Sequence, residues 1–272
     1  KVQFMPIVTL TSDYGWKDPD GAIVRGIIYS EMLKSGVAAP LIEITNSISP
    51  RDHLEAAYIV REAYKSFPKG SIHIVLVDSM TPSDMEIIAI EFDDHFFLAP
   101  NHGGLSLIRP DLNISNAVQI ELKNRPELIE SESQIAVTAV HLLNKGRFET
   151  IGKPLSHFKK LQTIHPEIRN ENTAIVHVQY IDHFGQLVTN ANEDWLKKWS
   201  KEREFVAIAR GRKIKNWISS REEMTETGSL YLKINRAGFL EIGIIEPGLG
   251  GSNSAASLLG IVIHDPIELQ IK

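Results

Sequence analysis

Carboxylates follow two apolar segments of the chain, and they are the first residues whose position suggests chemistry. Asp13 ends the first apolar run, and Asp78 ends a later β-branched run. Because ligands of open α/β sheets bind at the carboxyl edge of the strands, we expect Asp13 and Asp78 to share a site there. Asp18 and Asp20 follow before a predicted helix and are expected to join that site. Acids also cap helix N-termini and initiate turns, so these structural roles stay open as alternatives.

A later segment, Asp182-His183-Phe184-Gly185-Gln186, again joins a carboxylate, an aromatic ring and a glycine. It could form a hairpin closed by an Asx turn. It could equally offer a carboxylate to an ammonium group and a ring on which a nucleobase stacks. The spacing alone leaves both interpretations open. The glycine-rich segment 248–254 is expected to be a surface loop, with a carboxylate-binding run of backbone N–H groups as the alternative.

The order of predicted elements divides the chain into two kinds of structure. The first half alternates strands and helices, which predicts an α/β domain with a Rossmann-like, mainly parallel sheet. Its helices are expected over 21–34, 54–67 and 134–144, and its later strands over 41–44, 72–77, 87–92 and 95–98. The second half has short strands and one clear helix, over 194–199, which predicts an antiparallel β domain. Its strands are expected over 174–181, 205–209, 230–234, 239–245 and 261–271. We place the domains at 1–160 and 173–272, with a polar linker over 161–172.

Composition excludes several classes of function. The 272 residues are 43% hydrophobic, enough for one large core or two smaller ones. A net charge of −5 with scattered Lys and Arg argues against a nucleic-acid partner. No apolar run is long enough to cross a bilayer, so no membrane partner is expected. The chain has no cysteine and no metalloprotease-type histidine pair, so no metal site is predicted. We expect a cytoplasmic protein, although Lys at position 1 leaves a removed signal peptide as an alternative.

Six segments, in this order, resemble those of the S-adenosyl-L-methionine hydroxide adenosyltransferase family, which includes the fluorinase and chlorinase enzymes. The resemblance runs nearly end to end, and the six together are more specific than any one alone. The segments are Thr11-Ser12-Asp13-Tyr14-Gly15 with Asp18, Phe67 to Asp78, Ala99 to Gly103, Asp182 to Gly185 with Thr189-Asn190, Gly238 to Ile242, and Ser254 to Ala256 with Leu259-Gly260.

This resemblance implies a homotrimer that holds its ligand between the α/β domain of one subunit and the β domain of its neighbour. By the resemblance, Asp13 would hold the ribose hydroxyls, Asp182 the methionine ammonium, and Phe184 would pack on the adenine. Gln186 replaces the family's adenine-contacting Asn. Asn235-Arg236, or Arg236-Ala237, stands where the family's Ser-Arg grips the methionine carboxylate. S-adenosylmethionine or adenosine would be the small-molecule partner, and no cofactor is expected.

The chain departs from the family where its hydrolases activate water with Asp, Arg and His. Asp78 matches the Asp, but Met85 stands at the Arg position and Glu130 at the His position. Two nearby carboxylates without a cation between them share a proton, and an incoming sulfonium would favour ionisation of both. We therefore expect Asp78 and Glu130 to be the catalytic pair.

Three functions compete on this basis. The first, which we expect, is hydrolysis of S-adenosylmethionine to adenosine and methionine by attack of water at the ribose 5′ carbon. The second is a halogenase, because Thr81 and Ser131 fall where the fluorinase has halide-binding hydroxyls. Asp78 replaces a Tyr there, however, and a carboxylate repels a halide. The third is a protein that binds S-adenosylmethionine or a nucleoside without catalysis.

Overall fold

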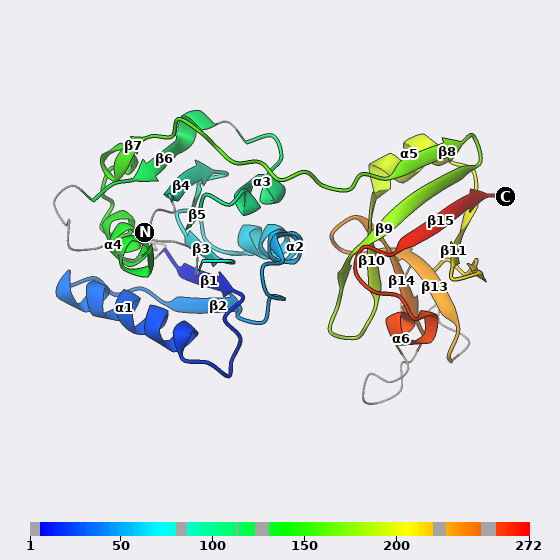
Figure 1. Ribbon diagram of the computed structural model, residues 1–272, viewed down its shortest axis with the longest axis horizontal. Helices are drawn as coiled ribbons and strands as arrows, with labels where there is room; N and C mark the ends of the chain where they lie inside the picture. The colour runs from blue at the N-terminus through cyan, green and yellow to red at the C-terminus, as the bar shows by residue number, and fades with distance from the viewer. Residues whose placement is uncertain (1–5, 80–85, 113, 123–130, 220–226, 246–253) are drawn as a thin grey trace, which may run out of the picture. The chain divides into compact units, whose positions relative to one another are not determined.

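The computed structural model describes residues 6–79, 86–112, 114–122, 131–219, 227–245 and 254–272. The chain divides into two units, Lys1–Gln162 and Thr163–Lys272 (Figure 1). The strand β8 (Glu167–Asn170) lies within the range that the sequence assigns to a linker. Its four residues are exposed and pair with β9 (Thr173–Ile181), so this polar stretch forms an edge strand of the second unit.

A seven-stranded sheet, in the order β2-β1-β3-β5-β4-β6-β7, organises the first unit. β1 (Val8–Ser12), β2 (Leu41–Thr45), β3 (Ile72–Leu76) and β5 (His95–Pro100) pair in parallel. β4 (Ile87–Phe92), β6 (Ala117–Ile120) and β7 (Gly152–Pro154) extend the sheet with antiparallel pairings. The α/β class is confirmed. The Rossmann-like description is not, because the sheet continues beyond β5 in antiparallel fashion.

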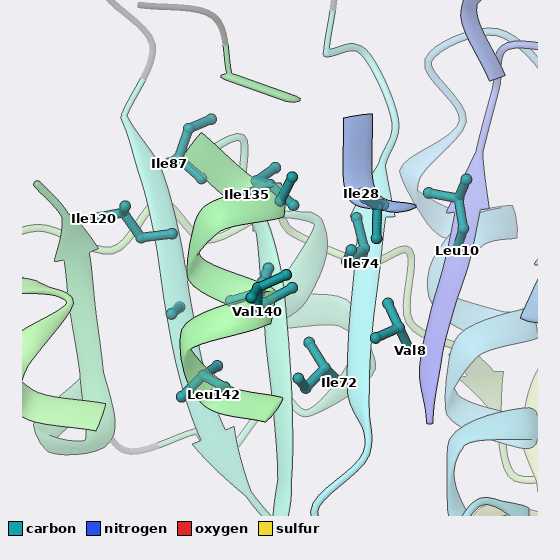
Figure 2. Close-up of a cluster of buried hydrophobic side chains, with 14 of the residues drawn as sticks. Val8, Leu10, Ile28, Ile72, Ile74, Ile87, Ile120, Ile135, Val140 and Leu142 are labelled. Atoms are coloured by element: carbon teal, nitrogen blue, oxygen red, sulfur yellow. The ribbon is translucent and has the colours of Figure 1, made fainter. Parts of the chain in front are cut away.

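Helices cover both faces of this sheet, which is why β1 and β3 are buried at every position. α1 (Asp20–Lys34) and α4 (Ser131–Leu143) lie on one face, and α2 (His53–Ala63) and α3 (Gly104–Ile108) lie on the other (Figure 1). Figure 2 shows α4 side chains among apolar residues of β1, β3, β4 and β6. The helix expected to reach residue 67 ends at Ala63, and a 3-10 turn follows it (Tyr64–Ser66). Two further 3-10 turns span Ile114–Asn116 and Phe148–Thr150.

The second unit is an antiparallel sheet of eight strands, as the sequence predicts in class. On the main path the order is β12-β11-β15-β9-β10-β14-β13, and β8 pairs with β9. Leu232 on β13 exchanges backbone hydrogen bonds with the segment after β12, to Asn216 O (2.8 Å) and from Ile218 N (3.0 Å), so the sheet closes nearly into a barrel. The remaining elements are β10 (Leu187–Asn192), β11 (Phe205–Ala209), β12 (Arg212–Ile214), β13 (Leu230–Ile234), β14 (Phe239–Ile244), β15 (Pro266–Ile271), α5 (Glu193–Ser200) and α6 (Ala255–Leu259).

The last expected strand is shorter than predicted, because a turn precedes it. Asp265 N donates to Val262 O (3.2 Å), and Val262 N donates to Asp265 Oδ2 (3.1 Å). β15 therefore begins at Pro266 rather than at residue 261. In the part of the chain that the structure describes, no helix has the length and apolar character needed to span a membrane.

Two histidines, His73 on β3 and His95 on β5, are buried beside Tyr64 in the 3-10 turn after α2. His73 Nδ1 lies 2.8 Å from Thr9 Oγ1, and His73 Nε2 lies 3.1 Å from His95 Nδ1. Burial, and then the neighbouring His95, lowers the pKa of His73 to about 3, and burial also lowers the pKa of His95. Both imidazoles are therefore neutral in the folded protein near neutral pH.

We predict that the protein loses stability in mild acid because of this pair. The pKa of His73 is lower in the folded state than in the unfolded state, so the unfolded state binds more protons below pH 6.5. The free energy of unfolding should fall by about 1.4 kcal/mol per pH unit for His73 alone. Urea unfolding from about pH 7.5 to about pH 4.5 would measure this slope. His73→Asn, which keeps a partner for Thr9, should reduce it. Equal slopes in the two proteins would contradict the assignment.

Candidate functional site

One carboxylate oxygen organises the carboxyl edge of the first sheet. Ser12 at the end of β1 is paired in parallel with Leu76 at the end of β3, so Asp13 and Asp78 leave the sheet side by side. Asp13 Oδ2 accepts hydrogen bonds from Asp78 N (3.1 Å) and from Arg51 N (2.9 Å). The predicted proximity of Asp13 and Asp78 is confirmed. Within the described residues, the hydrogen bonds to the Asp13 carboxylate all arrive at Oδ2, so its other oxygen faces no protein donor.

Both backbone donors to Asp13 are in the left-handed region. Arg51 has φ 65° and Asp78 has φ 55°. A residue with a Cβ in this conformation costs about 1 kcal/mol or more, and such strain persists where the surroundings fix it. Here the Asp13 carboxylate fixes it, because each strained residue points its N–H at the same oxygen. The strain is therefore concentrated at the candidate site.

Arg51 also supplies the cation that the sequence analysis finds missing beside Asp78. Its Nε lies 3.2 Å from Asp78 Oδ1. The expectation of a carboxylate pair without a cation is therefore wrong for Asp78. The Arg51 side chain is 79% exposed, so the ion pair contributes less than about 1 kcal/mol to stability. Its main consequence is to orient the Asp78 carboxylate. Glu130, Thr81 and Met85 lie outside the described residues.

Two histidines, His53 and His102, also lie near this sheet edge. The sequence analysis does not predict either of them as a site residue. His53 is the first residue of α2, after the N-cap Asp52, and its ring centroid lies 5.8 Å from that of His102. Burial and His102 lower the pKa of His53, while Asp78, Asp13 and Asp52 oppose that shift. His53 is therefore neutral near neutral pH. One feature of the sequence could have identified His53 as a site residue. It follows the predicted strand over 41–44, and the carboxyl end of β2 lies at the same sheet edge as Asp13.

The other predicted residues of the first unit lie at helix starts or in the loop before α1. Asp20 lies in the first turn of α1, where an acid stabilises the helix N-terminus, and Asp18 is exposed in the preceding loop. Ser131 is the first residue of α4. Tyr14 connects the edge to that helix, because its hydroxyl lies 2.6 Å from Ser79 Oγ and 3.3 Å from Glu132 Oε1. Ligand contacts for Asp18, Asp20 and Ser131 stay predictions.

In the second unit, the Asp182 turn has the Asx geometry that the sequence left open. Asp182 Oδ1 accepts from Phe184 N (2.9 Å) and Gln186 N (2.8 Å), while the Phe184 side chain is 57% exposed. The exposed ring is free of the core and can stack on a planar ligand. The roles predicted for Asp182 and Phe184 remain predictions.

A buried polar cluster fixes Gln186 behind this turn. The Tyr231 hydroxyl donates to Gln186 Oε1 (2.8 Å) and lies 3.3 Å from Glu241 Oε1, which Lys233 Nζ approaches at 2.9 Å. Gly243 makes room for this ring, because a Cβ there would lie 2.2 Å from the Tyr231 hydroxyl oxygen. The amide of Gln186 is therefore held in one orientation.

Asn235 and Arg236 lie far from that turn along the same ladder. They belong to the turn between β13 and β14, where Asn235 Oδ1 accepts from Phe239 N (3.0 Å). Leu187 pairs with Ile242, whereas Asn192 pairs with Phe239. The two ends of β10 are thus about 16 Å apart at the usual strand rise. The structure does not bring Asn235 and Arg236 together with Asp182 and Gln186, so their shared role stays a prediction.

Two further sequence predictions concern the glycine-rich segment 248–254 and the absence of a metal site. Residues 248–253 lie outside the described residues, and Ser254 caps α6 by accepting from Ser257 N (3.1 Å). Across the described ranges, no group of three or more His, Asp or Glu side chains is placed to hold a metal ion. At the sheet edge the described residues offer carboxylates, the guanidinium of Arg51 and the imidazoles of His53 and His102.

Comparison with known proteins connects these residues to a family. Residues 8–152 match the SAM hydroxide adenosyltransferase N-terminal domain, and residues 176–268 match the C-terminal domain of the same name. An (R)-S-adenosyl-L-methionine hydrolase from Methanocaldococcus jannaschii is 24% identical over 271 residues, covering 97% of this chain and 96% of the relative. A fluorinase from an Actinoplanes species is 21% identical, covering 71% of this chain and 74% of the relative.

Two solved structures share the fold. A conserved protein of uncharacterized function from Thermotoga maritima aligns with a TM-score of 0.80 and 22% identity, covering 97% of this chain and 100% of that one. A conserved hypothetical protein from Thermus thermophilus aligns with a TM-score of 0.68 and 21% identity, with the same coverage. At these identities the structures support the fold alone.

We predict opposite stability changes for two substitutions at the sheet edge. Asp13→Ala removes the acceptor of two backbone N–H groups and should lower the free energy of unfolding by about 2–3 kcal/mol. Arg51→Gly keeps its N–H and relieves the left-handed strain, so it should raise stability by about 0.5–1 kcal/mol. Urea unfolding of both variants beside the wild type measures this. An Arg51→Gly protein as unstable as Asp13→Ala would mean that the side chain of Arg51, not its amide, holds the loop.

Proposed function

Because this chain belongs to the SAM hydroxide adenosyltransferase family, we propose that it hydrolyses S-adenosyl-L-methionine to adenosine and methionine. The observation that supports this most is the arrangement of Asp13, Arg51 and Asp78 at one sheet edge. The similarity to a hydrolase named for the (R) isomer supports it further, and it makes both sulfonium diastereomers substrates to assay.

The proposed reaction asks little of the protein beyond position. Water attacks the ribose 5′ carbon, a C–O bond forms, and the C–S bond breaks with its electron pair going to sulfur. Methionine leaves as a neutral thioether, so the leaving group is already good. Placing the water in line with the C–S bond is then mainly a proximity effect. One proton must leave the water.

The described residues offer a group for each of these tasks. Asp13 Oδ1 can accept from ribose hydroxyls while Oδ2 holds the two backbone segments. Asp78, oriented by Arg51, would hold the attacking water and attract its proton. Asp182 and Phe184 would bind the methionine ammonium and the adenine, as the family resemblance implies. Glu130 is proposed as the second catalytic carboxylate beside Asp78, and Thr81, Ser131, Gln186, Asn235 and Arg236 are further proposed ligand contacts.

We predict that Asp78→Asn abolishes turnover but keeps binding. The amide can still hold a water molecule, but it lacks the negative charge that draws the proton, so adenosine formation should fall about 10²-fold or more. Chromatography would measure adenosine, and calorimetry would measure binding of S-adenosylmethionine. Asp111→Asn is the matched control, since Asp111 is an acid of the same unit paired with Arg109.

The outcomes separate the three functions. Wild type that binds S-adenosylmethionine but releases no adenosine over hours is a binding protein. Turnover that requires added halide indicates a halogenase, a reaction that the Asp78 carboxylate disfavours by repelling the anion. If Asp78→Asn turns over as fast as the wild type, the role of Asp78 is wrong even though hydrolysis stands.

We also predict a homotrimer in solution. The proposed substrate needs groups from both units of the chain, Asp13 and Asp182, and the family resemblance implies that they come from two subunits. Light scattering at micromolar concentration should give three times the 30.5 kDa chain mass. A monomer under those conditions would remove the intersubunit version of the proposal.

A further inference from the structure

His53 begins α2 two residues after Arg51, which contacts both Asp13 and Asp78, yet the function as proposed so far gives its imidazole no task. His53 N donates to Arg51 O (3.1 Å), and Arg51 N donates to Asp13 Oδ2 (2.9 Å). The backbone of His53 is therefore fixed relative to Asp13 through a single intervening residue. Its ring packs against Gly104 so closely that a Cβ there would lie 3.1 Å from His53 Nδ1. The backbone of His53 is thus held by Arg51, and its ring lies close to the backbone of Gly104.

We propose that His53 accepts the proton that water loses as it attacks the ribose 5′ carbon. This inference rests on the proposed hydrolysis and names the destination of its proton. In the step, the water oxygen bonds to carbon, the C–S bond breaks, and methionine departs neutral. His53 becomes an imidazolium, which then returns its proton to solvent. Substrate and water thus give adenosine, methionine and one proton.

His53 suits this task better than Asp78 does. Arg51 already occupies Asp78 Oδ1. A general base works best when its pKa lies near the working pH, and imidazole is the side chain that ordinarily titrates in that range. His53 is neutral near neutral pH and so is ready to accept a proton. In this inference His53 replaces Asp78 as the proton acceptor. Asp78 and Arg51 act as positioning residues that hold the water, and the Asp78 carboxylate also stabilises the imidazolium, so its charge is still needed for turnover.

The groups around His53 shift its pKa in opposite directions. His102, in the segment before α3, disfavours the imidazolium, as burial does. Asp13 after β1, Asp78 after β3, and Asp52 on its own helix favour it. Arg51, two residues before His53, is paired with Asp78. The proton acceptor is thus held neutral by its environment, while three carboxylates stabilise the charge that it gains.

The pH dependence of turnover tests this assignment. For the wild type, kcat for adenosine release should rise with pH along one limb whose midpoint lies below 6.5, since the pKa of His53 is lowered from that value. His53→Gln should remove the limb and lower kcat about 10²-fold or more, with KM little changed. His102→Gln should move the limb to higher pH, because His102 disfavours the imidazolium. His141→Gln, at a half-buried histidine of α4 outside the site, should leave the profile unchanged.

A second variant and a second readout cover the case in which His53→Gln fails to fold. Gly104→Ala keeps every ionisable group but displaces the His53 ring, so it should lower kcat more than it changes KM. The NMR titration of the His53 ring in the free wild type should have the same midpoint as the limb in kcat/KM, because both report the free enzyme.

The results separate the two proposals. A wild type that releases no adenosine from either diastereomer overturns hydrolysis, and the role of His53 with it. An active wild type whose His53→Gln variant keeps both kcat and the limb overturns only the role of His53. An NMR midpoint that differs from the kinetic one by more than about one pH unit does the same.

Discussion

The site depends on one oxygen atom, Asp13 Oδ2, which holds two backbone segments in conformations that they would not adopt alone. Arg51 and Asp78 both have left-handed φ angles, and both donate their N–H to that oxygen. Parallel pairing of β1 with β3 places Asp13 and Asp78 together, and the turn after β2 brings Arg51 to them. The ion pair between Arg51 and Asp78, and the start of α2 at His53, follow from this arrangement.

In the second unit, too, one carboxylate oxygen accepts hydrogen bonds from two backbone N–H groups. Asp182 Oδ1 accepts from two backbone N–H groups of its own turn, as Asp13 Oδ2 does from two separate segments. In each case one carboxylate oxygen shapes the protein backbone. A structural role and a ligand-binding role therefore do not compete for such a residue, because a carboxylate has two oxygens and several acceptor positions.

Much of the fold could be predicted from the sequence because its strands are apolar and β-branched. β13 has the predicted bounds, and Asp52 caps α2, in keeping with the preference of Asp for helix N-caps. The helices α3 and α6, of five residues each, have no periodic pattern long enough to detect. The cation beside Asp78 escaped prediction for another reason. Arg51 reaches Asp78 from a left-handed position in the turn between β2 and α2, and residue spacing alone does not encode that contact.

The contact between Tyr231 and Gly243 limits how this family member can change over evolutionary time. A side chain at position 243 would occupy the space of the Tyr231 hydroxyl, so the larger residue can appear there only after the ring has gone. Loss of the ring first would leave Gln186 Oε1 without its buried donor. Each single step is therefore unfavourable. Positions 231 and 243 should vary together among relatives, and a relative with a side chain at 243 should hold its counterpart of Gln186 by other means.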